Sequence, residues 1–249
     1  MPSFSKSDQR NASAIAQRML AAPTADLRWA AIQLTLQDLG ATAVNAAAVC
    51  PELRQPNWFR SSLPRATREE YAKSYIGSDF IVDHVASSRH PLIWQTERRI
   101  AYEGIEKYSK FADFVRDAGK QVVLSCSFRP AVSANIHSIT YCSTLKSNEV
   151  VAPQNLRRIE IAMQLLLPWL GSPEDSAASD LVPLPGHQLS PRELQVLRLI
   201  AGGLMTARIA DELGISEVTV TKHLSSACRK LDARTRAEAV ARALRSARF

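Results

Sequence analysis

The chain has few of the features that mark secreted, metal-binding or membrane proteins. Its cysteines, Cys50, Cys126, Cys142 and Cys228, are scattered with no CxxC pair and no histidine at metal-ligand spacing, which indicates reduced, buried thiols and no structural zinc. No run approaches the roughly 18 apolar residues of a membrane span. The opening MPSFSKSDQR has no apolar stretch behind its charges, so we expect no secretory signal and a cytoplasmic location. No spacing of a nucleophile and a base occurs, so we expect neither an enzyme nor a cofactor.

The length and the charge distribution narrow the class of protein. A chain of 249 residues with 46% apolar side chains can form one large domain or two ordinary ones, each with a core. The net charge is +7, and the segment from Gly186 to the end carries eleven Lys or Arg residues against six Asp or Glu residues. A basic segment of this kind is typical either of a solvated surface or of a domain that binds a polyanion.

A linker is predicted by the composition of residues 171–188. This stretch, GSPEDSAASDLVPLPGHQ, is rich in Pro, Ser, Gly and Asp and has no apolar period, whereas helical patterns lie on both sides of it. We therefore expect a first domain at residues 1–170, a linker at residues 171–188 and a second domain at residues 189–249.

Helical and strand-like patterns alternate in the first domain. Helices are predicted at Ser7–Leu20, Thr24–Leu39 (with Thr24 as N-cap), Asp79–Ser87, Gly104–Ala118 and Asn155–Trp169, and strands at Ala41–Val49, Pro91–Thr96, 121–128 and 134–143. The last two strands are separated by RPAVS, which predicts a hairpin. The expected fold class is α+β, with an antiparallel sheet between layers of helices, followed by a small all-α domain.

The second domain has the spacing of a helix-turn-helix. Ser190 and Glu193 form a capping box before a helix whose predicted inward residues are Leu194, Leu197, Ala201 and Leu204. Gly202–Gly203 and Gly214–Ile215 mark a predicted helix end and a tight turn. Predicted N-caps are Thr206, Ser216 and Thr235, the last of which begins a helix ending at Phe249. Four helices in about sixty residues, with a short Gly-bearing turn between the second and third, predict a DNA-binding module.

The third helix of this module has two chemically different faces. Its apolar stripe consists of Val220, Leu224, Ala227 and Leu231. The opposite side carries Val218, Thr221, Lys222, Ser225 and Arg229, which are an ordinary solvated face or a surface for base edges and phosphates. The helix-turn-helix spacing and the local basic charge favour DNA binding.

The segment LSPRELQVLRLIAGGLMTARIADELGISEVTVTKHLSSACRKLDARTRAEAVARA closely resembles the C-terminal domain of LuxR-type transcription regulators. Matching residues include Glu193, Gly203, Ile209, Ala210, Leu213, Ile215, Ser216, Thr219, Val220, His223, Lys230, Leu231, Arg236 and Ala239. The resemblance implies contacts with double-stranded DNA from the polar face of the third helix and from Thr206 and Ser216. Because one helix-turn-helix of this size contacts few bases, we also expect a homodimer. RNA polymerase is a further expected partner, and no membrane is expected. Thr221 departs from the family pattern, in which a Lys is common, and Lys222 is the candidate for that phosphate contact.

The stretch YIGSDFIVDHVASSRHPLIW, residues 75–94, resembles the acyl-homoserine-lactone-binding domain of quorum-sensing LuxR members. The matching residues are Tyr75, Asp79, His84, Pro91 and Trp94, together with Tyr71 if one residue is deleted, Phe111 and Gly119. Because the predicted strands are antiparallel, a phosphorylated receiver domain is not expected.

The resemblance implies a role for each matched residue in binding a small molecule. Asp79 would accept the ligand's amide N–H, Tyr71 would donate to a carbonyl, and Trp94 would wall off the lactone head. The hydroxyls of Ser125, Ser138 and Thr140 on the last two strands line the pocket or bond within the sheet. The alternative interpretation of Asp79 is the N-cap of the helix that follows it.

Three departures affect the expected ligand. Thr67 (or Ala66) and Leu63 stand where the family has a Trp and a Tyr, and Phe80 replaces a common Pro. The ligand is then an acyl-homoserine lactone of atypical structure or another small molecule. The alternative is a regulator that needs no ligand and uses its first domain for dimerisation or for binding a partner.

Overall fold

The computed structural model describes residues 6–51, 54–98, 105–131, 135–171, 180–182, 184, 189–231 and 233–245. The chain divides into two compact units, the first ending at residue 183 and the second beginning at residue 184. Each unit has its own apolar core. Most of the predicted linker, residues 172–179, 183 and 185–188, lies outside the described residues.

The first unit is built on a five-stranded antiparallel sheet with the strand order β2-β1-β5-β4-β3. The strands are β1 (Ala43–Cys50), β2 (Gln55–Ser61), β3 (Leu92–Gln95), β4 (Val122–Phe128) and β5 (Ile136–Ser143). The predicted hairpin is present, because β4 and β5 pair antiparallel with Ser125 opposite Thr140. Both neighbours of β1 also run antiparallel to it.

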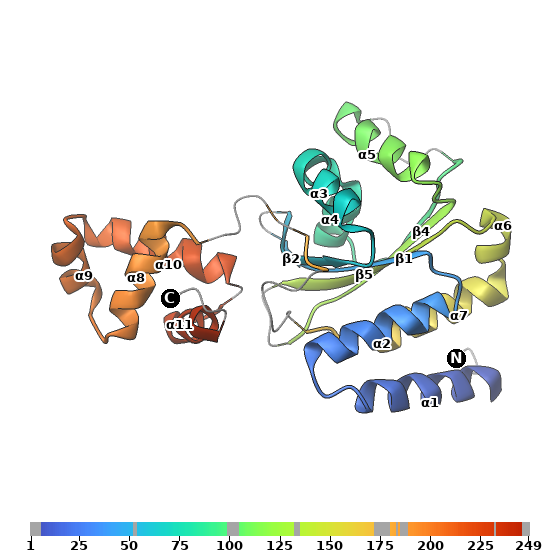
Figure 1. The fold of residues 1–249 in the computed structure, drawn as a ribbon, viewed down its shortest axis with the longest axis horizontal. Helices are drawn as coiled ribbons and strands as arrows, with labels where there is room; N and C mark the ends of the chain where they lie inside the picture. The colour runs from blue at the N-terminus through green and yellow to red at the C-terminus, as the bar shows by residue number, and fades with distance from the viewer. Residues whose placement is uncertain are drawn as a thin grey trace. The chain divides into compact units, whose positions relative to one another are not determined.

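Helices cover both faces of this sheet, as Figure 1 shows. One layer consists of α1 (Lys6–Leu20), α2 (Ala25–Gln37) and α7 (Pro153–Leu166), and the other of α3 (Arg65–Ser74), α4 (Phe80–Ser87) and α5 (Glu106–Asp117). Short helices at Ile76–Ser78 (η1), Ser147–Val150 (α6) and Leu167–Trp169 (η3) complete the described elements. The prediction of an antiparallel sheet between helices is confirmed. Thr24 caps α2 as predicted, because its hydroxyl accepts a hydrogen bond from the Leu27 amide at 3.2 Å.

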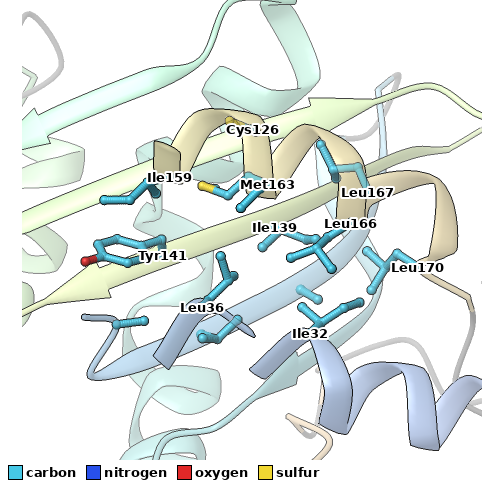
Figure 2. Packing of buried hydrophobic residues seen from close by; sticks show 14 of the residues in the cluster. Ile32, Leu36, Cys126, Ile139, Tyr141, Ile159, Met163, Leu166, Leu167 and Leu170 are labelled. Carbon is cyan, nitrogen blue, oxygen red and sulfur yellow. The ribbon is translucent and has the colours of Figure 1, made fainter. Parts of the chain in front are cut away.

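The main core lies between the sheet and the α1–α2–α7 layer. Figure 2 shows Ile32 and Leu36 of α2 and Met163 and Leu166 of α7 gathered around Ile139 of the central strand β5. All five side chains are fully buried. Burial of each of these large side chains stabilises the fold by about 1.5–3 kcal/mol.

The segment between β1 and η1 was not predicted. It forms β2 and α3, whose sequences QPNWFRS and RATREEYAKS carry too many polar residues for a clear period. The edge position of β2 explains its Pro56, because an edge strand can leave one amide out of the ladder. Tyr71, a predicted ligand contact, lies on the buried face of α3.

The second unit consists of α8 (Pro191–Ala201), α9 (Thr206–Leu213), α10 (Glu217–Lys230) and α11 (Arg236–Arg245). The left-handed Gly214 (φ 64°) forms the turn between α9 and α10. The Ser216 and Thr235 caps are confirmed, since their hydroxyls accept from the amides of Thr219 and Glu238. The predicted end of the last helix at Phe249 lies outside the described residues.

Two local predictions for this unit are wrong. Thr206 is the first residue of α9 rather than its cap, and the capping position is held by Met205, which has no side-chain oxygen to offer. Ala201 is exposed rather than inward-facing. Leu197 is fully buried as predicted, and Val196, which was not predicted to face inward, is fully buried as well. Ala201 is the last residue of α8, where the chain turns at the two glycines.

A buried ion pair joins α8 to α10. The Glu193 carboxylate accepts from the Ser190 amide at 2.7 Å, which completes the predicted capping box, and from Lys230 Nζ at 2.8 Å. Burial opposes the ionised form of Glu193, but these hydrogen bonds outweigh burial and lower its pKa below the usual 4.5. The same carboxylate therefore fixes the start of one helix and the end of another.

We expect Glu193→Gln to destabilise the second unit at neutral pH by roughly 1–3 kcal/mol, because the amide keeps the Ser190 acceptor but loses the charge that binds Lys230. The folded-state pKa is lowered, so this stability is present above pH 4.5 and is lost as the pH falls through the folded-state pKa. Hydrogen exchange of the Val196 and Leu197 amides, followed as a function of pH, measures the free energy of unfolding of the second unit. A difference between variant and wild type that stayed constant into acid would contradict the assignment.

Candidate functional site

A cavity lies between the sheet and the α3–α4–α5 layer of the first unit. Its floor is formed by β1, β2, β4 and β5, and its roof by residues of α3, α4 and α5. Most of its lining is apolar, and its volume is about 70 Å³. This is smaller than the roughly 300 Å³ or more of pockets that hold drug-sized ligands. A ligand of that size therefore enters only if the apolar side chains of the wall shift.

The centre of the roof is a buried pair of polar side chains, Tyr71 and Asp79. The Tyr71 hydroxyl donates to Asp79 Oδ2 at 2.8 Å, and the Ile81 amide donates to Asp79 Oδ1 at 2.7 Å. Asp79 is thus the N-cap of α4, and it also lines the cavity. The Val82 amide also contributes a hydrogen bond to this carboxylate. A carboxylate has about four lone-pair sites, so these bonds leave capacity for a further donor. The two interpretations of Asp79 do not exclude each other.

Burial dominates the electrostatics of this pair. It raises the pKa of Asp79 from 3.8 to about 6, even though the hydrogen bonds from Tyr71 and Ile81 favour the ionised form. Burial also raises the pKa of Tyr71 well above its usual value, with the Asp79 charge adding to the effect. Tyr71 therefore remains a donor at physiological pH, and Asp79 ionises near neutrality.

A row of polar side chains crosses the floor of the cavity. In the strand registers Ser61 stands opposite Asn45, Asn45 opposite Thr140, and Thr140 opposite Ser125. The Thr140 hydroxyl donates to Ser125 Oγ at 3.1 Å. Ser61, Asn45 and Thr140 line the cavity, as does the predicted Ser138, whereas Ser125 is not part of the wall.

Two further predicted ligand contacts lie away from the cavity wall. Trp94 is completely buried against Phe80, with ring centroids 5.0 Å apart, and its indole N–H donates to the Arg98 carbonyl at 3.3 Å. Tyr75 stacks on Phe114 at 4.3 Å. Thr67 and Leu63, which stand where the family has a Trp and a Tyr, do line the cavity. The roles of Trp94 and Tyr75 as ligand contacts remain predictions.

The chain returns to the free edge of β2 at residues 180–182. The Ser61 amide donates to the Asp180 carbonyl at 3.0 Å, and the Val182 amide to the Phe59 carbonyl at 2.9 Å. The buried Arg60 guanidinium donates to both carboxylate oxygens of Asp180. It also donates to Asp26 Oδ1 at 2.7 Å. Val182 lines the cavity. A segment that follows the first unit's helices thus closes one side of the cavity.

The exposed face of α10 is the second candidate site. Val218 is 64% exposed, and Lys222, Ser225 and Arg229 are exposed beside it around a shallow depression. The opposite stripe is internal, as predicted, with Val220 and Ala227 fully buried. The Thr221 hydroxyl bonds to the Glu217 carbonyl at 2.9 Å, so it offers DNA an acceptor more readily than a donor.

The predicted contacts from other parts of the second unit differ in their availability. Ser216 uses its hydroxyl to cap α10, in contact with the Thr219 hydroxyl at 2.9 Å, while its side chain stays at the surface. Thr206 is half-buried at the start of α9. Both remain predictions as DNA contacts.

Comparison with known proteins matches the second unit to one family. The family described as bacterial regulatory proteins, luxR family, matches residues 187–243. The spore germination protein GerE of Bacillus subtilis is 44% identical over 57 residues, which are 23% of this chain and 77% of GerE. The chain belongs to the luxR family of regulatory proteins. The expectation that it is not an enzyme agrees with this membership.

Other luxR-family relatives match over a short part of their length. The quorum sensing-dependent transcriptional regulator RpaR of Rhodopseudomonas palustris is 45% identical over 62 residues, 25% of this chain and 26% of RpaR. The chain spans about a quarter of the length of the curated relatives that it matches in this way.

Solved structures extend the comparison to the first unit. A structure of SdiA from Escherichia coli has a TM-score of 0.52 and 19% identity, covering 95% of this chain and 96% of SdiA. At this identity the likeness shows a shared fold, an antiparallel α+β unit followed by a luxR-family helix-turn-helix unit.

Sequence reasoning missed many residues of the cavity wall, among them the polar Asn45 and Arg68. Asn45 is the one polar residue in the run AVNAAAV, and the strand period of two sets it on the face opposite Val44 and Ala46. Arg68 precedes Tyr71 by three residues, which places both on one face of α3. Both signals were present in the sequence. The one for Arg68 could not be used, because α3 was not predicted and Arg68 could not be assigned to a helix face.

We expect Asp79→Asn to raise the melting temperature of the first unit at neutral pH. Between pH 3.8 and about 6 the folded state holds a proton that the unfolded state lacks, so stability falls as the pH rises through this window. The amide removes this cost, its oxygen still accepts from the Ile81 amide, and the Tyr71 hydroxyl keeps a partner by accepting from the new NH2 group. Thermal unfolding followed by tryptophan fluorescence measures the change, because all four tryptophans precede residue 184. A lower melting temperature for the variant at neutral pH would refute the analysis.

Proposed function

We propose that the protein is a bacterial transcription regulator that binds double-stranded DNA as a homodimer and responds to a small amphiphile held in the first unit's cavity. The observation that carries DNA binding is the exposed face of α10, the second helix of the helix-turn-helix, with Lys222 and Arg229 opposite a buried apolar stripe. Membership of the luxR family supports the same conclusion.

The chemistry of this face suits a major groove. Val218 offers a methyl contact to thymine, Ser225 bonds either base edges or phosphates, and the two cations are placed two turns apart along the helix. Described helices in this chain are too short and too polar to cross a membrane. The exposed cations and hydroxyl groups of α10 support double-stranded DNA as the partner of this surface.

Dimerisation is proposed because one helix-turn-helix of this size reads few bases. In the second unit Ala237 and Ala241 of α11 are exposed, whereas Val240 packs partly on the unit's own core and Leu244 lies outside the residues whose side chains are described. The first unit offers Leu27 and Leu34, two turns apart on α2 and each more than half exposed. Exposed large apolar residues on one helix face favour a subunit contact there.

Ligand control is proposed from the cavity and its Tyr71–Asp79 pair. SdiA, which shares the fold, has been solved in complex with octanoyl-rac-glycerol, a single-chain amphiphile, at a TM-score of 0.54 and 19% identity. A similar molecule would place its chain among the apolar side chains and its polar head near Asp79. The small volume of the cavity, about 70 Å³, favours the second candidate, a regulator that needs no ligand.

We expect Lys222→Ala and Arg229→Ala each to weaken DNA binding by more than about tenfold, with a salt dependence shallower by about one unit for each lost phosphate contact. Fluorescence anisotropy at several salt concentrations measures both quantities, and the stoichiometry of the titration reports whether two chains bind each site. Lys73→Ala, which removes one exposed charge from α3 of the first unit, is the matched control. An unchanged affinity and slope for both α10 variants would refute this interface.

We expect Asp79→Asn to raise the ligand concentration needed for half-maximal DNA binding by about ten- to a hundredfold, because a charged acceptor is lost from a dry site. DNA affinity at saturating ligand should be unchanged. The measurement is a dose series of acyl-homoserine lactones and their ring-opened acids in the anisotropy assay. A flat response of both proteins to every compound would favour the ligand-independent regulator.

A further inference from the structure

Two buried polar atoms in the cavity wall have no hydrogen-bond partner. Among the described residues, six buried side-chain atoms lack a partner, and two of them belong to the cavity wall: Arg68 Nε and Asn45 Oδ1. A buried donor or acceptor without a partner costs free energy, and such groups in a ligand cavity are what a ligand can satisfy.

The two residues that carry these atoms both adjoin Ser61 in the cavity wall. Arg68 Nη1 donates to the Ser61 carbonyl at 3.3 Å, which holds the guanidinium over the end of β2. Asn45 stands directly opposite Ser61 in the β1–β2 register. Side chains of directly opposed residues share a face about 5 Å apart, so both groups reach the same part of the cavity.

Arg68 brings a buried positive charge to this part of the cavity wall. It is only 8% exposed, and within the described parts of the chain no carboxylate forms an ion pair with it. Arg65, three residues earlier on the same helix, is exposed and pairs with Glu69 at 2.8 Å. A guanidinium stays charged and matches a carboxylate in shape, so an anionic oxygen group is its natural ligand partner.

Asn45 requires the opposite chemistry. Its amide N–H points toward Cys142 Sγ at 3.8 Å, and the unpartnered Oδ1 can only accept a hydrogen bond. A carboxylate cannot satisfy it, because an ionised carboxylate has no donor. A hydroxyl group on the ligand can.

We propose that this cavity recognises an N-acylated hydroxy amino acid, with its carboxylate bound by Arg68 and its hydroxyl donating to Asn45 Oδ1. The inference rests on the proposed function, because it assumes that the ligand's amide N–H donates a hydrogen bond to Asp79. Arg68 and Tyr71 are three residues apart on α3, so the carboxylate and amide sites adjoin. N-acylhomoserine with its ring open carries all three groups, whereas the closed lactone has neither the carboxylate nor the hydroxyl.

Three probes separate these contacts in the full-length protein. They are N-hexanoyl-homoserine, its closed lactone, and N-hexanoyl-2-aminobutyrate, which keeps the carboxylate and lacks the hydroxyl. By calorimetry we expect the open acid to bind about ten- to a hundredfold more tightly than the lactone, and about three- to tenfold more tightly than the aminobutyrate.

Variants assign each preference to a residue. Arg68→Met should remove the preference for the acid over the lactone, and Asn45→Leu should make homoserine and aminobutyrate equal. Arg65→Met, on the exposed side of α3, is the matched control and should change neither. Thermal unfolding verifies that each variant is folded, and Arg68→Gln, which removes the charge but keeps a polar side chain, replaces Arg68→Met if that variant does not fold.

The possible outcomes are distinct. Lactone binding as tight as acid binding by the wild-type protein, or a preference for the acid that survives in the Arg68 variant, overturns the inference and leaves ligand control standing. Failure of all three probes to bind, with DNA affinity unaffected by any of them, overturns the proposed ligand control together with the inference. The wild-type comparison of the three probes decides the question even without the variants.

Discussion

The first unit depends on the fact that strand β1 must be covered on both of its faces. It lies inside the sheet between β2 and β5, and its sequence AVNAAAVC consists mainly of small residues. Val44, Ala46 and Ala48 face the core formed with α2 and α7, whereas Ala43, Asn45 and Ala47 face the cavity. Alanines bring little volume to a floor that a bulkier strand would have filled. The cavity is therefore a consequence of the composition of one strand.

The Tyr71–Asp79 pair is a candidate binding site whose ionised carboxylate lowers the stability of the folded state near neutral pH. A carboxyl whose pKa is raised to about 6 is held ionised at a cost near neutral pH. The caps and bonds around it, from Ile81 and Tyr71, offset only part of this cost. A hydrogen-bond donor supplied from the cavity would favour the ionised form and thus couple occupancy to the stability of α4, the helix that Asp79 begins.

Sequence patterns predicted the parts of this protein where periodicity and local hydrogen bonds agree. The capping box of Ser190 and Glu193, the Gly214 turn and the two faces of α10 follow from short-range chemistry, and the structure has them. The edge strand β2 and helix α3 were missed because tertiary contacts, not their own composition, determine them. Trp94 illustrates a different limit. Its burial was foreseeable, but its position away from the cavity wall depends on tertiary packing such as its edge-to-face contact with Phe80.

The polar row of Ser61, Asn45, Thr140 and Ser125 also has a consequence for how the sheet assembles. On each strand the neighbouring residues point to the other face, and on β1, β5 and β4 these neighbours are core residues such as Ala46, Ile139, Tyr141 and Leu124. A slip of any of these strands by one residue would exchange the two sets and place a hydroxyl or an amide in the apolar core. Each mispairing would leave a polar group buried without a partner, at a cost of about 1–3 kcal/mol. The residues that line the cavity thereby discriminate against wrong strand alignments before any ligand is present.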